Sequence, residues 1–247
     1  NNMWWNYFCH CFSEDVGWID FEKEIAKVLS CFDIFIKDYS TKGSFPQNTF
    51  NIIRHFYKFA NKIIAGGMSD SYGGWIENIF EIKDEYFTKD ALRSNKRILN
   101  KEKIANDLYC DLQSFSNALG LYYKCFIDEP IGKLANNNDI SKNNYFSNTN
   151  TFVVSFNYTS TFEQLYSYNE DFQQITHIHG SIKDKSIIGV NPDINDDISG
   201  DTTFAFFKKY FQRVIYKTDT KYLTWLEIYK SAYDSECEIN HSTSCLG

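Results

Sequence analysis

The sequence is poor in the residues that interrupt regular structure, with only 3 prolines and 12 glycines among 247 residues. Aromatic residues are abundant instead: they make up 18% of the chain, with 22 Phe and 17 Tyr. A chain of this length with 43% hydrophobic residues can bury a substantial core. The composition therefore excludes disorder along the whole chain and indicates a globular protein.

Long apolar runs and an excess of positive charge are also missing. No stretch approaches the ~18 consecutive apolar residues that a membrane span needs, and no charged-then-apolar leader opens the sequence. The formal charge is −7 and the pI is about 5.3, whereas binding nucleic acid by general phosphate neutralisation requires a concentrated basic surface. We expect a cytoplasmic protein with neither a membrane nor a nucleic acid as partner.

Cysteine is present but without a repeated spacing. The seven cysteines are Cys9, Cys11, Cys31, Cys110, Cys125, Cys237 and Cys245. An odd, scattered set in a cytosolic chain predicts mostly free thiols. The triplet Cys9-His10-Cys11 suggests zinc, but adjacent residues cannot all point at one ion and no second pair matches it. We predict no metal site there.

Apolar residues recur near the helical period in several stretches. They predict helices over residues 18–36, 50–65, 101–126, 204–216 and 221–233, and a shorter element over 75–80. Residues 136–150 are dominated by Asn, Ser, Asp and Lys and read as a linker. We divide the chain into a mostly helical region (1–135), this linker, an α/β nucleotide-site region (151–233) and an atypical tail (234–247), within one domain overall.

The region after the linker has the layout of an α/β unit. A β-rich run over Thr151–Phe156 is followed by a helical stretch over Thr161–Tyr168 and a second β-rich run over Gln174–Gly180, with a possible third strand over 186–190. Strand, helix and strand in this order predict a parallel sheet.

Candidate site residues follow the first of these strands. In open α/β sheets ligands bind at the carboxyl ends of the strands, where Asn157 and Tyr158 lie. Thr159 or Ser160 can cap the next helix in a capping box with Glu163. Asn157 is a poor strand former that the cap does not explain, which favours contact with a ligand.

Two histidines mark the second strand. If residues 174–180 form one strand, His177 and His179 point to the same side and can bind a metal, but no further ligand cluster is nearby. His179, directly before Gly180, can instead contact a nucleotide or act as a general base. The alternative is a hydrogen-bonded histidine of the core.

A basic series occupies the helix predicted near the end of the chain. Its members are Lys208, Lys209, Arg213, Lys217 and Lys221. Because they fall mainly at four-residue steps, they form one helix face that can meet phosphates. We favour a solvated face.

Three segments together resemble a known family: WIDFE at Trp18–Glu22, SFNYTSTFEQLY at Ser155–Tyr166, and HIHGSIKDKSIIG at His177–Gly189. In order and spacing they resemble the bacterial AbiH abortive-infection proteins. The resemblance implies a role in phage defence and a phage-derived trigger. The family's GNGFD-like glycine turn and its GHSL-like strand end have no match here, so we expect a copy that is incomplete at its N- and C-termini.

That family is distantly similar to SIR2-like NAD-binding proteins. The resemblance implies an α/β fold, a SIR2-like, Rossmann-like parallel sheet with a large helical insertion. It also implies NAD as substrate or ligand, with His179 and Asn157 as catalytic residues. Asn157, Tyr158, Thr159, His177 and Gly180 would bind the nucleotide, with no metal.

The implied activity leaves alternatives open. Thr159 stands where a SIR2 deacetylase has aspartate, which puts deacetylation in doubt and favours NAD hydrolysis. A non-catalytic nucleotide-binding or phage-sensing module is the alternative. A metal-dependent nuclease using His177 and His179 is disfavoured by the acidic charge and the missing ligands.

Overall fold

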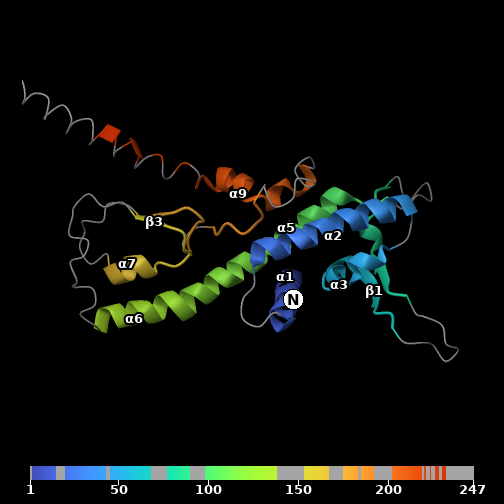
Figure 1. Cartoon of the computed structure of the whole chain (residues 1–247), viewed down its shortest axis with the longest axis horizontal. Helices are drawn as coiled ribbons and strands as arrows, with labels where there is room; N and C mark the ends of the chain where they lie inside the picture. Colours follow the sequence, from blue (N-terminus) through green and yellow to red (C-terminus); the bar gives the residue numbers. More distant parts are fainter. Residues whose placement is uncertain are drawn as a thin grey trace, which may run out of the picture. The chain divides into compact units, whose positions relative to one another are not determined.

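In a computed structural model, whose helices and strands are labelled in Figure 1, the chain divides into two compact units. The first unit comprises Asn1–Ser116 and Ile188–Phe211, and the second comprises Asn117–Ile187 and Gln212–Gly247. The structure describes residues 2–14, 20–42, 45–67, 77–89, 98–137, 153–166, 175–182, 185–191, 202–218, 220, 223, 226–227 and 230–231. The expectation of one domain overall stays a prediction.

Helices dominate the first unit. They are α1 (Met3–Glu14), α2 (Phe21–Lys42), α3 (Phe50–Ile53) and the first part of α5 (Lys101–Tyr123), with 3-10 turns at Gln47–Thr49, Tyr57–Phe59, Asp84–Tyr86 and Thr202–Phe207. The side chains of Asn2 and Asp20 accept hydrogen bonds from backbone N–H groups in the first turns of α1 and α2. The helices predicted over 18–36 and 101–126 are confirmed over their described residues.

The helix predicted over 50–65 is wrong beyond its first turn. Phe56 and Phe59 close 3-10 turns by donating backbone hydrogen bonds to Ile53 and Phe56, so their three-residue spacing buries both rings without an α-helix. The chain then forms β1 (Ala60–Ile64), which pairs antiparallel with β2 (Ile79–Ile82). The element predicted over 75–80 overlaps β2 in its described residues. The β-branched isoleucines of both strands favour the sheet.

Aromatic rings fill the core of the first unit. Trp4 meets Phe56 edge-on at 5.2 Å between ring centroids, and Phe32 meets Phe56 and Phe59 in the same way at 5.3 and 5.4 Å. The Trp4 indole N–H donates to the Leu108 carbonyl at 2.9 Å, which satisfies its polar atom. Edge-to-face contacts of this kind stabilise the packing beyond the area they bury.

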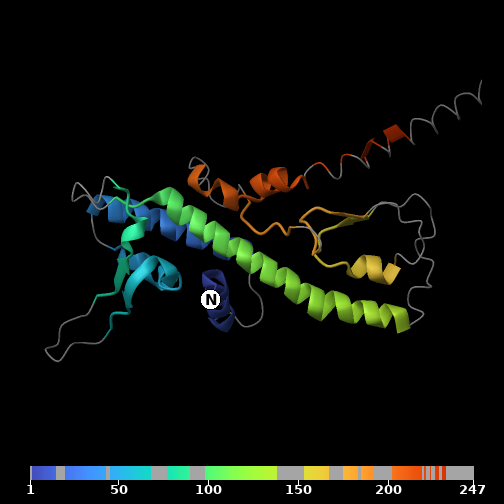
Figure 2. The same ribbon diagram turned by 180° about the vertical axis from the view of Figure 1, so that it is seen from behind.

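The second unit contains the parallel pair predicted from the sequence. Strands β3 (Val153–Ser155) and β4 (Ile175–His177) are parallel with Ser155 opposite His177, and α7 (Thr161–Tyr166) connects them in sequence. Figure 2 shows α7 beside α6 (Glu129–Asn137), which follows α5 through a π-helical turn at Lys124–Asp128. The third strand expected over 186–190 is wrong: Val190 makes an isolated bridge to Lys208 instead.

The chain's class is mixed α/β, mostly helical with small sheets. A wider Rossmann-like, SIR2-like sheet stays a prediction. The linker predicted over 136–150 begins inside α6, and residues 138–150 lie outside the described part of the chain. The helix expected over 204–216 is present as the 3-10 turn Thr202–Phe207 and α9 (Lys209–Tyr216). Of the helix expected over 221–233, the described residues 223, 226–227 and 230–231 are helical.

None of the described helices is long and apolar enough to cross a bilayer. Five of the seven cysteines lie in the described part of the chain, and all five are free thiols. They are Cys9, Cys11, Cys31, Cys110 and Cys125.

Candidate functional site

The candidate site lies in the second unit, where β3 and β4 end. Because the strands are parallel, the residues after Ser155 and after His177 leave the sheet at the same edge. Asn157 is solvent-exposed at this edge, and its carbonyl oxygen accepts a hydrogen bond from His177 Nδ1 at 2.6 Å. The two segments predicted to form the site are therefore joined directly.

The strand expected over Gln174–Gly180 ends earlier, at His177, and this separates the two histidines. Residues 178 and 179 form a turn, so the alternation that would place both rings on one side of a strand stops. Both ring nitrogens of His177 face acceptors: the Asn157 carbonyl and, at 2.6 Å, the Glu163 carboxylate. A doubly protonated ring satisfies both partners. These bonds disfavour His177 as a metal ligand, and the described residues contain no cluster of three metal-binding side chains.

His179 has a different environment. Its ring lies 5.9 Å from the Phe156 ring and 6.5 Å from the Tyr158 ring, between centroids. An Arg213 guanidinium nitrogen is 3.4 Å from His179 Nδ1. Since a guanidinium can only donate, Nδ1 is the acceptor in this contact and the ring proton sits on Nε2. A basic residue of α9 thus belongs to the site and is not part of a solvated face.

Gly180 shapes the turn that carries His179. Its φ is +78°, a left-handed conformation that other residues adopt at a cost. A Cβ atom at this position would lie 2.2 Å from the Lys185 carbonyl oxygen. The turn is closed by Ile187, whose N–H donates to the His179 carbonyl at 2.9 Å. The glycine thus positions the turn, and nothing in its geometry tests the expected nucleotide contact.

Tyr158 and Thr159 have structural partners. The Tyr158 hydroxyl donates to the Ile187 carbonyl at 2.9 Å, and its ring stacks on Tyr123 at 6.2 Å with 10° between the planes. The Thr159 hydroxyl accepts from the Thr161 hydroxyl at 3.0 Å. Both side chains hold the loop between β3 and α7, so their expected role in binding a ligand stays a prediction.

The capping box predicted for α7 is wrong. Ser160 precedes the helix, but its backbone N–H donates to the Asp128 carboxylate at 3.1 Å, and its hydroxyl donates to the same carboxylate at 2.7 Å. Glu163, the expected partner, pairs with His177 instead. The sequence signal was insufficient because Asp128 comes from the π-helical turn, 32 residues earlier. A carboxylate at the start of α7 also suits the positive end of the helix dipole.

A second arrangement links WIDFE to two distant segments of the first unit. Glu22 accepts a hydrogen bond from Asn191 at 3.0 Å and forms an ion pair with Lys209, whose side chain is 9% exposed. The prediction of a solvated basic face is therefore wrong at Lys209 as well as at Arg213. The largely buried Lys209 ammonium is paired with the partly exposed Glu22 carboxylate, which offsets the cost of removing the charge from water.

The segments described above include those that resemble the AbiH proteins. Comparison with known sequences tests whether the chain belongs to that family. A model of the family described as bacteriophage abortive infection AbiH matches residues 2–236. The chain belongs to the AbiH family. No curated protein and no solved structure matches it. As a member of the AbiH family, the chain has a role in abortive infection of phage-infected cells.

Within this AbiH member, the structure brings together four groups that motif reading did not combine: Asp128, Glu163, Phe156 and Arg213. Glu163 lies inside SFNYTSTFEQLY, where the sequence pattern predicts a role in the helix cap. Asp128 and Arg213 lie far away in the sequence, and no motif marks them. A basic residue in an amphipathic helix was the one available signal for Arg213.

Proposed function

We propose that this AbiH protein binds NAD at the carboxyl ends of β3 and β4 and hydrolyses it. The observation that carries the proposal is the parallel pairing of Ser155 with His177. This pairing brings Asn157 and the HIHG turn (His177–Gly180) to one edge of the sheet. This edge is where α/β sheets bind ligands. The exposed side chain of Asn157 is available to hydrogen-bond a ribose hydroxyl or a water molecule.

The reaction consumes NAD and water and yields ADP-ribose, nicotinamide and a proton. Water attacks the ribose carbon that bears nicotinamide, nicotinamide leaves with the bonding electrons, and a base takes the proton from water. His179 is the proposed base, and the aromatic side chains of Phe156 and Tyr158 flank its ring.

The contact with Arg213 sets a condition for this chemistry. With Nδ1 accepting from Arg213, His179 Nε2 carries the ring proton and donates rather than accepts. For His179 to act as a base through Nε2, Arg213 must leave Nδ1. A phosphate of the nucleotide is a stronger partner for a guanidinium than an imidazole nitrogen is, so ligand binding supplies the reason for Arg213 to move.

The alternative function is nucleotide binding without turnover, in a sensing module. Two observations favour it: the His179–Arg213 contact keeps Nε2 a donor, and Thr159 offers a hydroxyl where a deacetylase has an acid. In this case His179 donates to a ribose oxygen, and no proton is abstracted.

One experiment separates these functions: NAD binding by calorimetry and NAD loss over time, on the purified chain and its Asn157→Ala and His179→Ala variants. Asn61→Ala, an exposed asparagine of β1, is the matched control. Hydrolysis predicts NAD loss that falls by roughly 100-fold or more without His179 and is unchanged in the control. Binding with no loss selects the alternative, and absence of both binding and loss contradicts the proposal.

A further inference from the structure

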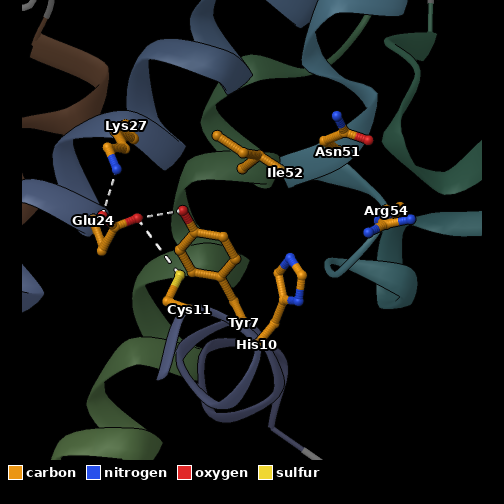
Figure 3. A pocket seen from close by; sticks show the side chains of 8 residues that line it. All are labelled: Tyr7, His10, Cys11, Glu24, Lys27, Asn51, Ile52 and Arg54. Carbon is orange, nitrogen blue, oxygen red and sulfur yellow. Dashed lines mark hydrogen bonds and ion pairs between the residues drawn. The ribbon is translucent and has the colours of Figure 1, made fainter. Parts of the chain in front are cut away.

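A pocket of about 310 Å³ lies in the first unit, and it shares no residue with the site at β3 and β4. Figure 3 shows its lining, which comes from α1, α2 and the segment around α3. The lining residues are Tyr7, His10, Cys11, Glu24, Lys27, Asn51, Ile52 and Arg54. A volume at the lower end of the range for ligand pockets suits a small molecule.

On one wall of the pocket the charged side chains are paired with each other. Glu24 forms an ion pair with Lys27 at 2.5 Å, accepts from the Tyr7 hydroxyl at 2.7 Å, and lies 3.6 Å from the Cys11 sulfur (Figure 3). Burial raises the Glu24 pKa, but the hydrogen bonds from Lys27 and Tyr7 outweigh it and hold that pKa below its usual value. Glu24 is therefore an anion whose charge Lys27 balances.

Cys11 does not add a reactive group to this wall. Burial, together with the Glu24 charge, raises the pKa of its thiol to about 11. The neutral thiol is neither a nucleophile nor a metal ligand at neutral pH. The pocket is thus suited to binding rather than to covalent chemistry.

Arg54 lies on the pocket wall without a counter-ion among the described residues. In Figure 3 it lies with Asn51 on the side away from Glu24 and Lys27. No described residue forms an ion pair or side-chain hydrogen bond with its guanidinium, and its Nε atom is buried without a partner. An arginine is charged at every relevant pH, and a buried donor without an acceptor destabilises the fold.

The neighbouring histidine pair does not neutralise the charge of Arg54. His10, which lines the pocket, stacks on His55 at 4.4 Å between ring centroids. Burial, with His10 and Arg54 nearby, lowers the pKa of His55 to about 4, so His55 is neutral at physiological pH and does not add to the charge. Lys27 is paired with Glu24, so among the described arginines and lysines of the lining Arg54 is the cation without an ion pair.

We propose that this pocket binds a small molecule through an oxyanionic group, a phosphate or a carboxylate, held by Arg54 with Asn51 beside it. Both oxyanions match the planar donor fork of arginine. Asn51 adds an amide donor at the exposed rim. The proposal does not depend on NAD binding in the second unit.

The test uses inorganic phosphate and acetate as probes on the intact chain, at constant ionic strength. The readout is the rate at which phenylglyoxal modifies Arg54, followed by mass spectrometry of the peptide that contains it. A bound oxyanion slows this rate in a saturable way, and the probe that protects at lower concentration identifies the preferred group. An unchanged rate with both probes at high concentration overturns the proposal.

Variants distinguish a built site from general charge attraction. Asn51→Asp places a negative charge beside Arg54 and should weaken protection about tenfold. Asn61→Asp adds the same charge at another exposed position of the first unit and should change nothing. Equal weakening by both variants would overturn the proposal. Arg54→Gln, checked for folding by thermal unfolding, should abolish calorimetric binding of the protecting probe, and undiminished binding would contradict the assignment.

Discussion

The first unit excludes Trp4, Phe32, Phe56 and Phe59 completely from solvent, whereas in the second unit Ile187 is the one apolar side chain, among its described residues, that is buried. The second unit instead exposes large apolar side chains, including Phe126 at 68% and Phe156 at 65%. Burying an aromatic side chain contributes about 1.5–3 kcal/mol, so the first unit has the larger hydrophobic stabilisation.

Polar contacts hold the described part of the second unit together. Asp128 caps α7, the Tyr158 hydroxyl bonds the Ile187 carbonyl, and His177 bridges Asn157 and Glu163. These residues also surround the candidate site. In the second unit a substitution near the site therefore acts on folding as well. In the first unit the pocket lining shares with the buried aromatic core the single residue Tyr7, whose ring lies 5.8 Å from that of Phe56.

The largest effect is expected from the aromatic core. Phe56→Ala removes a fully buried ring that contacts Trp4 and Phe32, and it should lower the free energy of unfolding by about 3–5 kcal/mol. Phe12→Ala, at a ring that is 56% exposed on α1, is the control and should cost less than about 0.5 kcal/mol. Denaturant unfolding measures both. Equal losses would mean that the core of the first unit does not dominate its stability.

The next effect tests the HIHG turn of the second unit. Gly180→Ala places an alanine in a left-handed backbone conformation, and its Cβ would displace the Lys185 carbonyl. The substitution should therefore destabilise the unit by at least about 2 kcal/mol. Gly120→Ala places its methyl in open space on α5 and should stabilise the helix by roughly 1 kcal/mol. Thermal unfolding compares the two, and opposite signs are expected. Stability unchanged by Gly180→Ala would show that the turn tolerates another conformation.

Part of this architecture was predictable because local patterns decide it. The helix at Lys101–Tyr123 followed from apolar residues at three- and four-residue steps, and the parallel pair followed from two β-rich runs around a helix. The helix predicted over 50–65 failed because the same spacing also fits 3-10 turns, and pairing with β2 decided the strand. Such pairing depends on residues distant in the sequence, which a local pattern does not contain.

The candidate site, too, combines features that local patterns predict with features that depend on residues distant in the sequence. The positions of Asn157 and His179 after their strands were predictable because each follows a β-rich run. Their partners were not, since Arg213 is 34 residues from His179 and no motif connects them. The pocket around Arg54 had no sequence signal, because its lining comes from three separate segments.

The two histidines of HIHG should separate stability from ligand binding. His177→Ala removes two hydrogen bonds, one to the Glu163 carboxylate, and should cost about 1–3 kcal/mol of unfolding free energy. His179→Ala removes the long contact to Arg213 at 3.4 Å and should cost less than about 1 kcal/mol while reducing NAD binding or turnover. Denaturant unfolding with calorimetry checks both. The reverse order of the two losses would contradict the assigned roles.

The smallest effect concerns acid sensitivity in the first unit. Burial first, then the nearby His10 and Arg54, lowers the pKa of His55 from 6.5 to about 4. As the pH falls, the unfolded chain takes up this proton before the folded chain does. The contribution of neutral His55 is therefore fully present above pH 6.5 and is lost as the pH falls toward about 4. Solvent screening of a half-buried ring leaves on the order of 1 kcal/mol.

His55→Phe keeps a ring stacked near His10 and removes the titrating group. Across this pH window the difference in unfolding free energy between the wild type and His55→Phe should grow in favour of the variant as the solution becomes more acidic. Denaturant unfolding at several pH values measures the difference. A constant difference would mean that His55 has the same proton affinity in the folded and unfolded chains, and that burial beside Arg54 does not control its charge.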